Sequence, residues 1–284
     1  MNARALVTGA AGRLADAGVE SPRVDAELLL AHVLGIPRAR LLTLDEVDDD
    51  AASRFEVLLG QRADRVPLQH LTGHAPFRFL ELAVGPGVFV PRPETELLVG
   101  WALEQLSGIA QPLVVDLGSG SGAIALSIAS EHPGARVIAV ERDTGAIEWT
   151  RHNARARAEA GDTPVEVVAG DMTDPRLLAE LDGGVDLVVS NPPYVPDGAR
   201  VPREVADHDP PLALWGGPDG LDVVRGLVGT AARLLRQEGS LGIEHADQQG
   251  GAVPAVVRAS GGWTDVRDHP DLAGRPRFTT ARRL

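Results

Sequence analysis

The feature that most constrains the fold is an alternation of short apolar segments with helical patterns, which begins near residue 112. Short strands that alternate with helices are typical of a mainly parallel sheet whose two faces are covered by helices. The last two segments have no helix between them, so we expect one of those two strands to be antiparallel. The candidate strands are 113–116, 136–141, 165–169, 185–190, 240–244, 263–267 and 278–282, and the main helical patterns are 123–130, 144–160 and 221–235.

The first part of the chain has helical patterns only. Ser21-Pro22 is a helix start, with a capping serine before a proline at the first helical position, and Gly35 is a typical stop. A second amphipathic helix is predicted after Asp50, which we interpret as its cap. The glycine pair within 8–12 has no strand before it, so we interpret that segment as a surface loop or a helix start. These patterns predict a helical domain over residues 1–75.

Between the two parts, apolar residues alternate over 77–90 around Gly85-Pro86-Gly87. Such alternation around glycine and proline predicts a β-hairpin with its turn at these three residues. We therefore expect a hairpin linker over 76–90, followed by a second domain over 91–284.

Composition narrows the chemistry. The chain has no cysteine, which excludes disulfides, thiolate zinc sites and the thiolate that methylation of carbon 5 of cytosine requires. The formal net charge of −13 disfavours nucleic acid and favours cationic ligands and basic protein partners. The histidines lack metal-ligand spacing, so we predict no metal site. Because the sequence has no long apolar run and no signal-peptide pattern, we expect a cytoplasmic protein without a membrane partner.

The strongest ligand-binding pattern is Asp116-Leu117-Gly118-Ser119-Gly120-Ser121-Gly122, directly after a candidate strand and before a helix. Its glycines allow a ligand to approach the backbone closely at the carboxyl end of the sheet. The obvious competitor is a dinucleotide site, but Asp116 would repel a pyrophosphate and the spacing is G-x-G-x-G rather than G-x-G-x-x-G. A carboxylate suits a cation. We therefore predict a site for S-adenosylmethionine, which carries an ammonium and a sulfonium group.

Acidic residues also follow the next two strands. Glu141 ends the second strand, a position that suits the two hydroxyls of an adenosine ribose. Asp171, just past the third strand, is placed to border the adenine, with Met172 as an apolar neighbour. Any one of these residues would fit a simple turn, but their positions at successive strand ends favour a nucleoside site.

The fourth strand closes with Ser190-Asn191-Pro192-Pro193-Tyr194. Consecutive prolines end a strand and fix the directions of the Asn191 side chain and the Pro192 carbonyl. These two acceptors can hold both N–H bonds of a planar NH2 group and orient its lone pair towards a methyl donor. Tyr194 can pack against that planar group. The motif does not name the substrate, because adenine and cytosine amino groups and glutamine amides all present the same geometry.

Further motifs cover nearly the whole chain, and the most distinctive is Phe89-Val90-Pro91-Arg92-Pro93-Glu94-Thr95-Glu96. Together with segments 21–29, 67–73, 191–194, 217–221 and 271–275, it resembles the bacterial release factor glutamine methyltransferases. The resemblance implies a small N-terminal helical domain joined by a hairpin to a Rossmann-like, seven-stranded class I methyltransferase domain. It also implies methyl transfer from S-adenosylmethionine, with S-adenosylhomocysteine as product. The acceptor would be N5 of the glutamine in the Gly-Gly-Gln motif of class 1 peptide chain release factors.

The resemblance also implies roles for particular residues. Phe89 would lie near the transferred methyl group, and Arg92 and Glu94 would form an ion pair that fixes their loop. The N-terminal domain would dock the protein substrate. Carried over by position, the cofactor site would include Gly118–Gly122, Glu141, Met172 and Asn191, and the glutamine site would include Asn191, Pro192, Pro193 and Tyr194.

Three departures from the family pattern leave the necessary groups in place. Glu141 stands where aspartate is common, Met172 where some relatives have an aromatic residue, and His208-Asp209-Pro210 replaces a more usual aromatic-Glu-Pro. Glu244 and His245 end the fifth strand, and we interpret both as packing or loop residues. The rival functions are adenine-N6 methylation of nucleic acid, glutamine methylation of a ribosomal protein, and a non-catalytic binding role.

Overall fold

The computed structural model describes all residues 1–284, and the chain divides into two compact units. The first unit comprises Met1–His74 and Val201–His208, and the second comprises Ala75–Arg200 and Asp209–Leu284. We predicted domains over residues 1–75 and 91–284. The structure instead groups Val201–His208 with the N-terminal helices. None of the helices is long and apolar enough to cross a membrane.

The N-terminal unit is helical. Its elements are α1 (Ala3–Asp16), α2 (Pro22–Leu34), the 3-10 helix η1 (Arg38–Thr43), α3 (Asp49–Ala63), α4 (Leu68–Thr72) and α8 (Arg203–His208). Phe55 and Leu59 of α3 are fully buried against apolar residues of α1 and α2. The buried Arg62 guanidinium donates to Asp25 of α2 at 2.8 Å and to Glu204 of α8 at 2.9 Å. This branched ion pair therefore joins three helices of the unit.

The predicted helix limits in this unit are partly confirmed. Ser21 precedes α2, and Gly35 ends it with a left-handed φ of 64°. The cap of α3 is Asp48, whose carboxylate accepts from the Ala51 backbone N–H at 2.8 Å, so our choice of Asp50 was wrong. Segment 8–12 lies inside α1 and is neither a loop nor a helix start.

The second unit contains a seven-stranded sheet in the order β5-β4-β3-β6-β7-β9-β8. The neighbours from β5 to β7 pair in parallel, whereas β9 pairs antiparallel with both β7 and β8. The predicted α/β, mainly parallel sheet and its antiparallel strand near the C-terminus are therefore confirmed. The strands are β3 (Leu113–Leu117), β4 (Arg136–Glu141), β5 (Glu166–Ala169), β6 (Val185–Ser190), β7 (Leu235–Glu244), β8 (Trp263–Pro270) and β9 (Pro276–Arg283).

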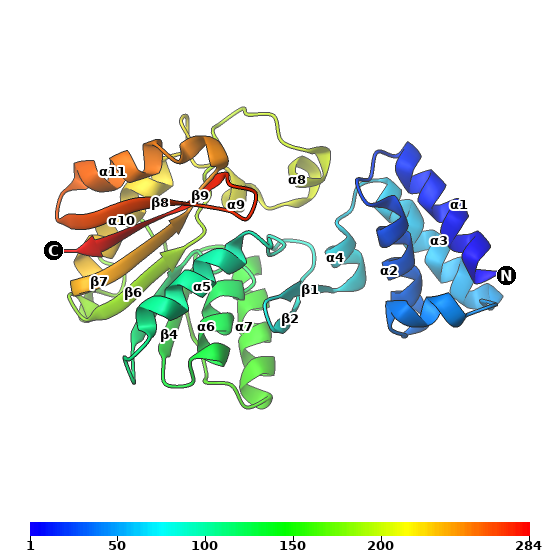
Figure 1. Ribbon diagram of the computed structural model, residues 1–284, viewed down its shortest axis with the longest axis horizontal. Helices are drawn as coiled ribbons and strands as arrows, with labels where there is room; N and C mark the ends of the chain where they lie inside the picture. The colour runs from blue at the N-terminus through cyan, green and yellow to red at the C-terminus, as the bar shows by residue number, and fades with distance from the viewer. The chain divides into compact units, whose positions relative to one another are not determined.

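Helices cover both faces of this sheet, as Figure 1 shows. One face packs against α5 (Thr95–Leu106), α6 (Ala123–Glu131) and α7 (Thr144–Glu159), and the other against α10 (Asp222–Leu234) and α11 (Ala252–Ser260). Short elements complete the unit: α9 (Pro211–Leu214) and the 3-10 helices η2 (Ala179–Leu181) and η3 (Asp247–Gln249). Since the central strands are buried on both sides, polar groups can reach a ligand only at the strand ends.

The hairpin lies elsewhere than predicted. It consists of β1 (His74–Phe77) and β2 (Leu80–Ala83), joined at Arg78 and Phe79. A turn does form at Gly85–Val88, but no strand follows it. Arg78 adopts a left-handed φ of 51° and its guanidinium binds Glu131 of α6 at 2.5 Å, so a long-range ion pair stabilises a turn that contains no glycine.

One asparagine of α7 connects the end of β2 to the glycine-rich segment. The Asn153 side chain accepts from the Ala83 N–H at 2.8 Å and donates to the Ala83 and Ser121 carbonyls, both at 2.9 Å. Because Asn153 is buried, removal of its amide leaves three backbone groups unpaired.

We predict that Asn153→Ala lowers the free energy of unfolding of the second unit by about 2–4 kcal/mol, because buried polar groups lose their partners. Urea unfolding followed by circular dichroism measures the change. Arg151→Ala, an exposed change on the same helix, is the control and should stay within about 0.5 kcal/mol of the wild type. Equal stabilities of the two variants would contradict the role of Asn153.

Candidate active site

The predicted site residues meet at one edge of the sheet. Strands β4, β3, β6 and β7 are parallel neighbours, so their carboxyl ends lie side by side. The polar residues at these ends are Asp116, Glu141, Asn191 and Glu244. Segments distant in sequence are thus brought together by strand pairing alone.

Hydrogen bonds from the backbone and from one side chain fix the glycine-rich loop to β4 and α7. The N–H groups of Gly118 and Ser119 donate to the Val140 carbonyl at 2.8 and 3.0 Å. The Thr150 hydroxyl of α7 donates to the Gly120 carbonyl at 2.6 Å. Gly118 has a φ of +83°, a left-handed conformation that favours glycine, and a Cβ there would lie 2.5 Å from the Met172 Cε.

Asp116 is completely buried at the end of β3. Its Oδ2 accepts from the Ala125 N–H at 3.1 Å, while its Oδ1 has no hydrogen-bond partner. Burial raises the pKa of this carboxyl to about 7, against the lowering effect of the Ala125 hydrogen bond and with a smaller raising effect from Glu141. A buried carboxylate with one unpaired oxygen is costly unless a cation or a donor binds it.

Glu141 organises the loop from the end of β4. One oxygen accepts from the Gly120 N–H at 2.9 Å, and the other accepts from the N–H groups of Arg142 and Asp143 at 2.8 and 2.9 Å. The carboxylate therefore bridges the glycine-rich loop and the start of α7. Contact with a ribose stays a prediction.

Asp171 and Met172 follow β5, as the sequence predicted. Burial alone would raise the pKa of Asp171, but hydrogen bonds from Thr173 and Arg142 lower it below its ordinary value. Arg142 lies 3.1 Å from the carboxylate. Met172 is buried beside Gly118, so an apolar side chain lies next to the glycine-rich loop.

The Asn191–Tyr194 segment follows β6 and is fixed on several sides. The Ser190 hydroxyl donates to the Leu117 carbonyl at 2.5 Å, which ties this strand end to β3. Pro192 and Pro193 are buried. The Gln249 amide donates to the Tyr194 carbonyl at 3.0 Å, and a Cβ at Gly220 would lie 2.3 Å from the same oxygen. Loop 216–220 and η3 thus pack directly against the proposed acceptor motif.

The charged groups around Tyr194 differ from our expectation. Arg92 pairs with Asp209 at 3.2 Å and lies 4.9 Å from the centre of the Phe89 ring, so the predicted ion pair with Glu94 is wrong. Asp209 belongs to the His208-Asp209-Pro210 departure noted in the sequence. Desolvation by burial, with a contribution from the Glu244 charge, raises the pKa of the Tyr194 hydroxyl, which therefore stays neutral.

Sequence reasoning missed two residues beside Asn191. The Asn191 Nδ2 donates to the buried Thr95 hydroxyl at 3.2 Å. Glu244 follows Ile243, the partner of Ser190 in the sheet, so it ends β7 beside Asn191. Glu244 is only 1% exposed, and burial raises its pKa to about 7. Our interpretation of Glu244 and His245 as packing or loop residues stays a prediction. The His245 imidazole is buried, with its Nε2 3.0 Å from the Asp268 carboxylate. The available signal was an acid at the end of an apolar strand.

Known proteins match both units. Residues 5–73 match the PrmC N-terminal domain family, and residues 84–207 match the methyltransferase small domain family. A release factor glutamine methyltransferase of Mycolicibacterium smegmatis is 52% identical over 99% of this chain and 98% of its own length. One of Deinococcus radiodurans is 44% identical over 100% of this chain and 99% of its own length. The chain belongs to the release factor glutamine methyltransferase family.

Solved structures share the methyltransferase fold with this family member. The hMettl16 catalytic domain in complex with MAT2A 3'UTR hairpin 6 aligns with a TM-score of 0.53 at 14% identity, over 84% of this chain and 83% of that chain. A T. thermophilus 16S rRNA methyltransferase in complex with AdoMet and guanosine aligns with a TM-score of 0.52 at 22% identity, over 74% of this chain and 50% of that chain. Both likenesses concern the fold.

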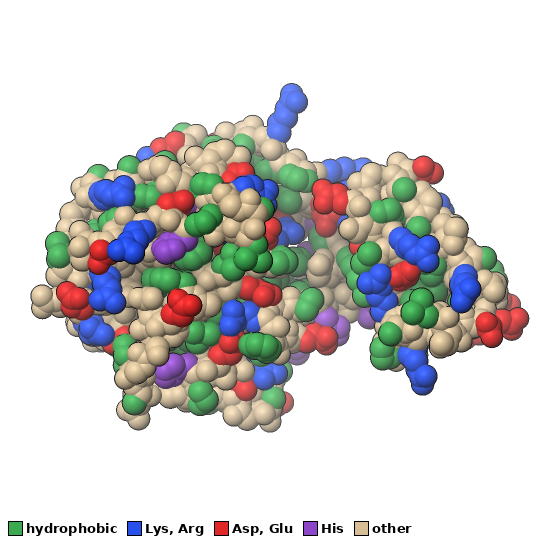
Figure 2. All heavy atoms as spheres, in the orientation of Figure 1, with side chains coloured by type: hydrophobic (Ala, Val, Ile, Leu, Met, Phe, Trp, Pro, Cys, Tyr) green, Lys and Arg blue, Asp and Glu red, His purple; other side chains and the backbone are tan.

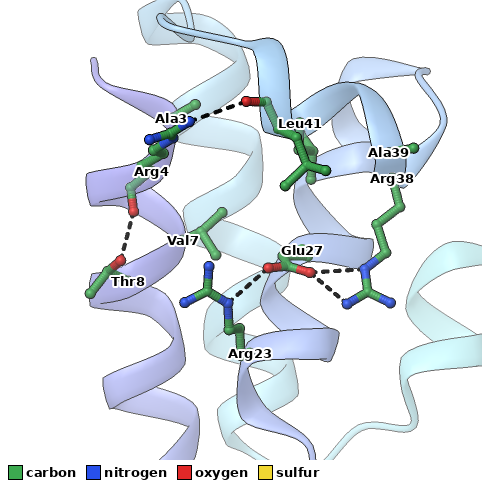
Figure 3. A pocket seen from close by; sticks show the side chains of 10 residues that line it. Ala3, Arg4, Val7, Thr8, Arg23, Glu27, Arg38, Ala39 and Leu41 are labelled. Atoms are coloured by element: carbon green, nitrogen blue, oxygen red, sulfur yellow. Dashed lines mark hydrogen bonds and ion pairs between the residues drawn. The ribbon is translucent and has the colours of Figure 1, made fainter.

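The N-terminal unit of this methyltransferase has a cavity of its own, of about 570 Å³. Figure 3 shows its wall, in which Glu27 binds both Arg23 and Arg38. Arg4, Thr8 and apolar residues of α1 and η1 line the rest, among them Leu42, which is 71% exposed. An apolar floor with arginines around it is suited to a protein surface.

We predict that Asp116→Asn stabilises the unliganded protein increasingly as the pH rises from 5 to 8. The pKa of Asp116 is raised from 3.8 to about 7, so the folded state favours the protonated acid. Its contribution to stability is complete below the unfolded pKa and is lost as the pH approaches 7, where the buried group ionises. Asparagine does not ionise and avoids this loss.

Urea unfolding at several pH values measures the difference between variant and wild type. Glu159→Gln, which removes an exposed carboxylate of α7, is the matched control and should show a small difference that does not grow with pH. A constant difference for Asp116→Asn would show that Asp116 does not titrate in this range.

Proposed function

We propose that this protein transfers the methyl group of S-adenosylmethionine to N5 of the glutamine in the Gly-Gly-Gln motif of class 1 peptide chain release factors. The observation that carries the proposal is the Asn191 carboxamide, fixed beside the rigid Pro192-Pro193 segment and next to the glycine-rich loop. Full-length relatives named release factor glutamine methyltransferase support the substrate. A cytoplasmic location follows from a substrate that acts in translation termination.

The residues present fit S-adenosylmethionine. The unpaired, buried Oδ1 of Asp116 is a suitable partner for its ammonium group. Glu141 lies at the strand end that suits a ribose, and Met172 offers an apolar surface to an adenine, bordered by Asp171. Ser119 and Ser121 are buried in the loop between these groups. The bound cofactor supplies an electrophilic methyl group on its sulfonium, and S-adenosylhomocysteine remains after transfer.

The Asn191–Tyr194 segment would orient the amide group of the substrate glutamine. An amide nitrogen is a weak nucleophile because its lone pair is delocalised. In our proposal the Asn191 side-chain oxygen and the Pro192 carbonyl accept the two N–H bonds of the glutamine, which directs the lone pair at the methyl group. The glutamine would be bordered by four further side chains: Phe89, Arg92, Glu94 and Tyr194. Transfer is direct, without a covalent intermediate or a metal, and the amide loses its proton during or after attack, so no strong base is required.

Charge favours a protein over a nucleic acid as substrate. The net charge is −13, and Figure 2 shows acidic and basic side chains interspersed on the face it presents. Binding to a phosphate backbone would need a basic surface that neutralises the phosphate charges. In our proposal the N-terminal unit docks the release factor through its own cavity, whose arginines suit an acidic segment.

The deciding experiment is methyl transfer from labelled S-adenosylmethionine to a purified release factor. The companion substrates are the same factor with its Gly-Gly-Gln glutamine changed to alanine, and duplex DNA. Label on the wild-type factor alone supports the proposal. Label on DNA would overturn the assignment of the acceptor, and label on neither substrate would favour a ribosomal protein or a binding role.

We predict that Asn191→Ala lowers kcat by at least about 10²-fold, the cost typical of removing one preorganised polar contact from a transition state. The variant should keep most of its affinity for S-adenosylmethionine, which calorimetry measures. Asn2→Ala, which removes only a helix cap in the N-terminal unit, is the control and should keep the wild-type kcat. A near-wild-type rate for Asn191→Ala would disprove the acceptor clamp.

We predict that Leu42→Glu raises KM for intact release factor by about tenfold, equivalent to ~1.4 kcal/mol, because it places a charge at the edge of an apolar docking surface. The KM for a short Gly-Gly-Gln peptide should not change, since the peptide lacks the folded surface that would dock on the N-terminal unit. Val57→Glu on α3, where the side chain is 64% exposed, is the control. Equal effects on factor and peptide would rule out docking at this cavity.

A further inference from the structure

We propose that Glu244 is a positioning residue that, together with Thr95, dictates which side of the Asn191 carboxamide faces the substrate glutamine. The inference rests on the proposed function, because it assigns the Asn191 oxygen to the acceptor. It adds two residues, from β7 and from the start of α5, to the residues that shape the reaction.

The hydrogen-bond network is closed on the side of Asn191 that faces the protein. Its Nδ2 donates to the Thr95 Oγ1 at 3.2 Å. Glu244 follows Ile243, which pairs with Ser190, so its carboxyl lies at the strand end beside Asn191, where hydrogen bonding from Thr95 and Asn191 lowers its pKa. Thr95 and Glu244 are 4% and 1% exposed, so water does not compete for these bonds.

Donor and acceptor counts give this network a direction. An ionised carboxylate can only accept hydrogen bonds. Thr95 must therefore donate its single proton to Glu244 and can only accept from Asn191. Both partners thus require the NH2 group of Asn191, and the amide oxygen is turned away from them. That oxygen is the group the glutamine N–H needs.

If the oxygen and NH2 group of the Asn191 side chain exchanged places, the shape of the site would stay the same but catalysis would be lost. Asn191 would then present its NH2 group to the NH2 group of the glutamine, and two donors cannot hydrogen-bond to each other. If the Asn191 carboxamide rotated freely between the two orientations, its oxygen would face the glutamine in only a fraction of the protein molecules. The carboxylate of Glu244 removes this ambiguity.

The surroundings of Glu244 allow its charge to change near neutral pH. The charged and titratable groups that face it are Arg277 of β9, Glu94 at the start of α5 and the Tyr194 hydroxyl. Burial has the largest effect and raises the pKa of Glu244 to about 7, although Thr95, Arg277 and Asn191 act in the opposite direction. Its Oε2 has no hydrogen-bond partner. Once protonated, Glu244 can donate to Thr95, and the network no longer selects one orientation of Asn191.

The test compares kcat against pH, at saturating cofactor and release factor, for the wild type and Glu244→Gln. We expect the wild-type kcat to fall several-fold as the pH drops from 8 to 6. Glutamine can present either an oxygen or an NH2 group, so Glu244→Gln should have a several-fold lower kcat at pH 8 and no decrease towards pH 6. The KM for S-adenosylmethionine should stay within twofold. A residue with only a structural role would lower the melting temperature and leave the pH profile unchanged.

A second pair of variants tests the network if Glu244→Gln is unstable. Thr95→Val removes the hydroxyl at nearly constant volume and should lower kcat about tenfold. Thr95→Ser keeps the hydroxyl and should restore most of that loss. In the unliganded protein, nuclear magnetic resonance should show the side-chain NH2 signals of Asn191 shifting with pH near 7 in the wild type and not in Glu244→Gln.

The outcomes separate the two proposals. A wild type that does not label release factor contradicts the proposed function, and the NMR titration still tests the network. If the wild type is active, any one of three results overturns the role of Glu244: a pH-independent wild-type kcat, an acid limb retained in Glu244→Gln, or equal rates for Thr95→Val and Thr95→Ser.

Discussion

Parallel pairing of β4, β3, β6 and β7 is the constraint on which the site depends. The side chains of these strands that pack in the two cores are apolar, because helices cover the sheet on both faces. Polar groups can therefore emerge only where each strand ends, and in a parallel set those ends share one edge. The glycine-rich loop and the Asn191–Tyr194 segment are adjacent for this reason, although they lie far apart along the chain. The Ser190 bond to the Leu117 carbonyl locks the two strand ends together.

Two carboxylates buried at this edge show that it is not optimised for stability. Asp116 and Glu244 each keep one oxygen without a partner, and burial raises the pKa of each to about 7. Groups of this kind destabilise the ionised folded state, and an asparagine or glutamine of the same shape would avoid that cost. Their presence at the ends of β3 and β7, on either side of β6, is understandable if one awaits a cationic ligand and the other selects the orientation of Asn191. Functional sites are where such costs are tolerated.

The sequence predicted the features that depend on local patterns. Strand and helix periodicity defined the sheet, and glycine spacing defined the loop after β3, because each pattern is contained in a short window. The errors involve distant partners. Arg92 pairs with Asp209, which is 117 residues away, instead of the nearby Glu94. The hairpin turns at Arg78 because that side chain binds Glu131, 53 residues away. Glu244 is marked in its own segment only as an acid at the end of an apolar strand, and the strand order β6-β7, which places it beside Asn191, is not visible there.

The chain that follows the Asn191–Tyr194 segment connects the sheet to the N-terminal unit. From Tyr194 the chain passes through loop 195–200 into α8, and α8 belongs to the N-terminal unit, where Glu204 pairs with Arg62 and Arg65. Arg62 in turn binds Asp25 of α2, in the helix that also carries the cavity residues Arg23 and Glu27. One continuous series of covalent and ionic links therefore runs from the cavity residues of the N-terminal unit to the Asn191–Tyr194 segment. If the N-terminal unit docks the substrate, as we propose, these links connect the docking surface to the proposed acceptor segment along the chain itself.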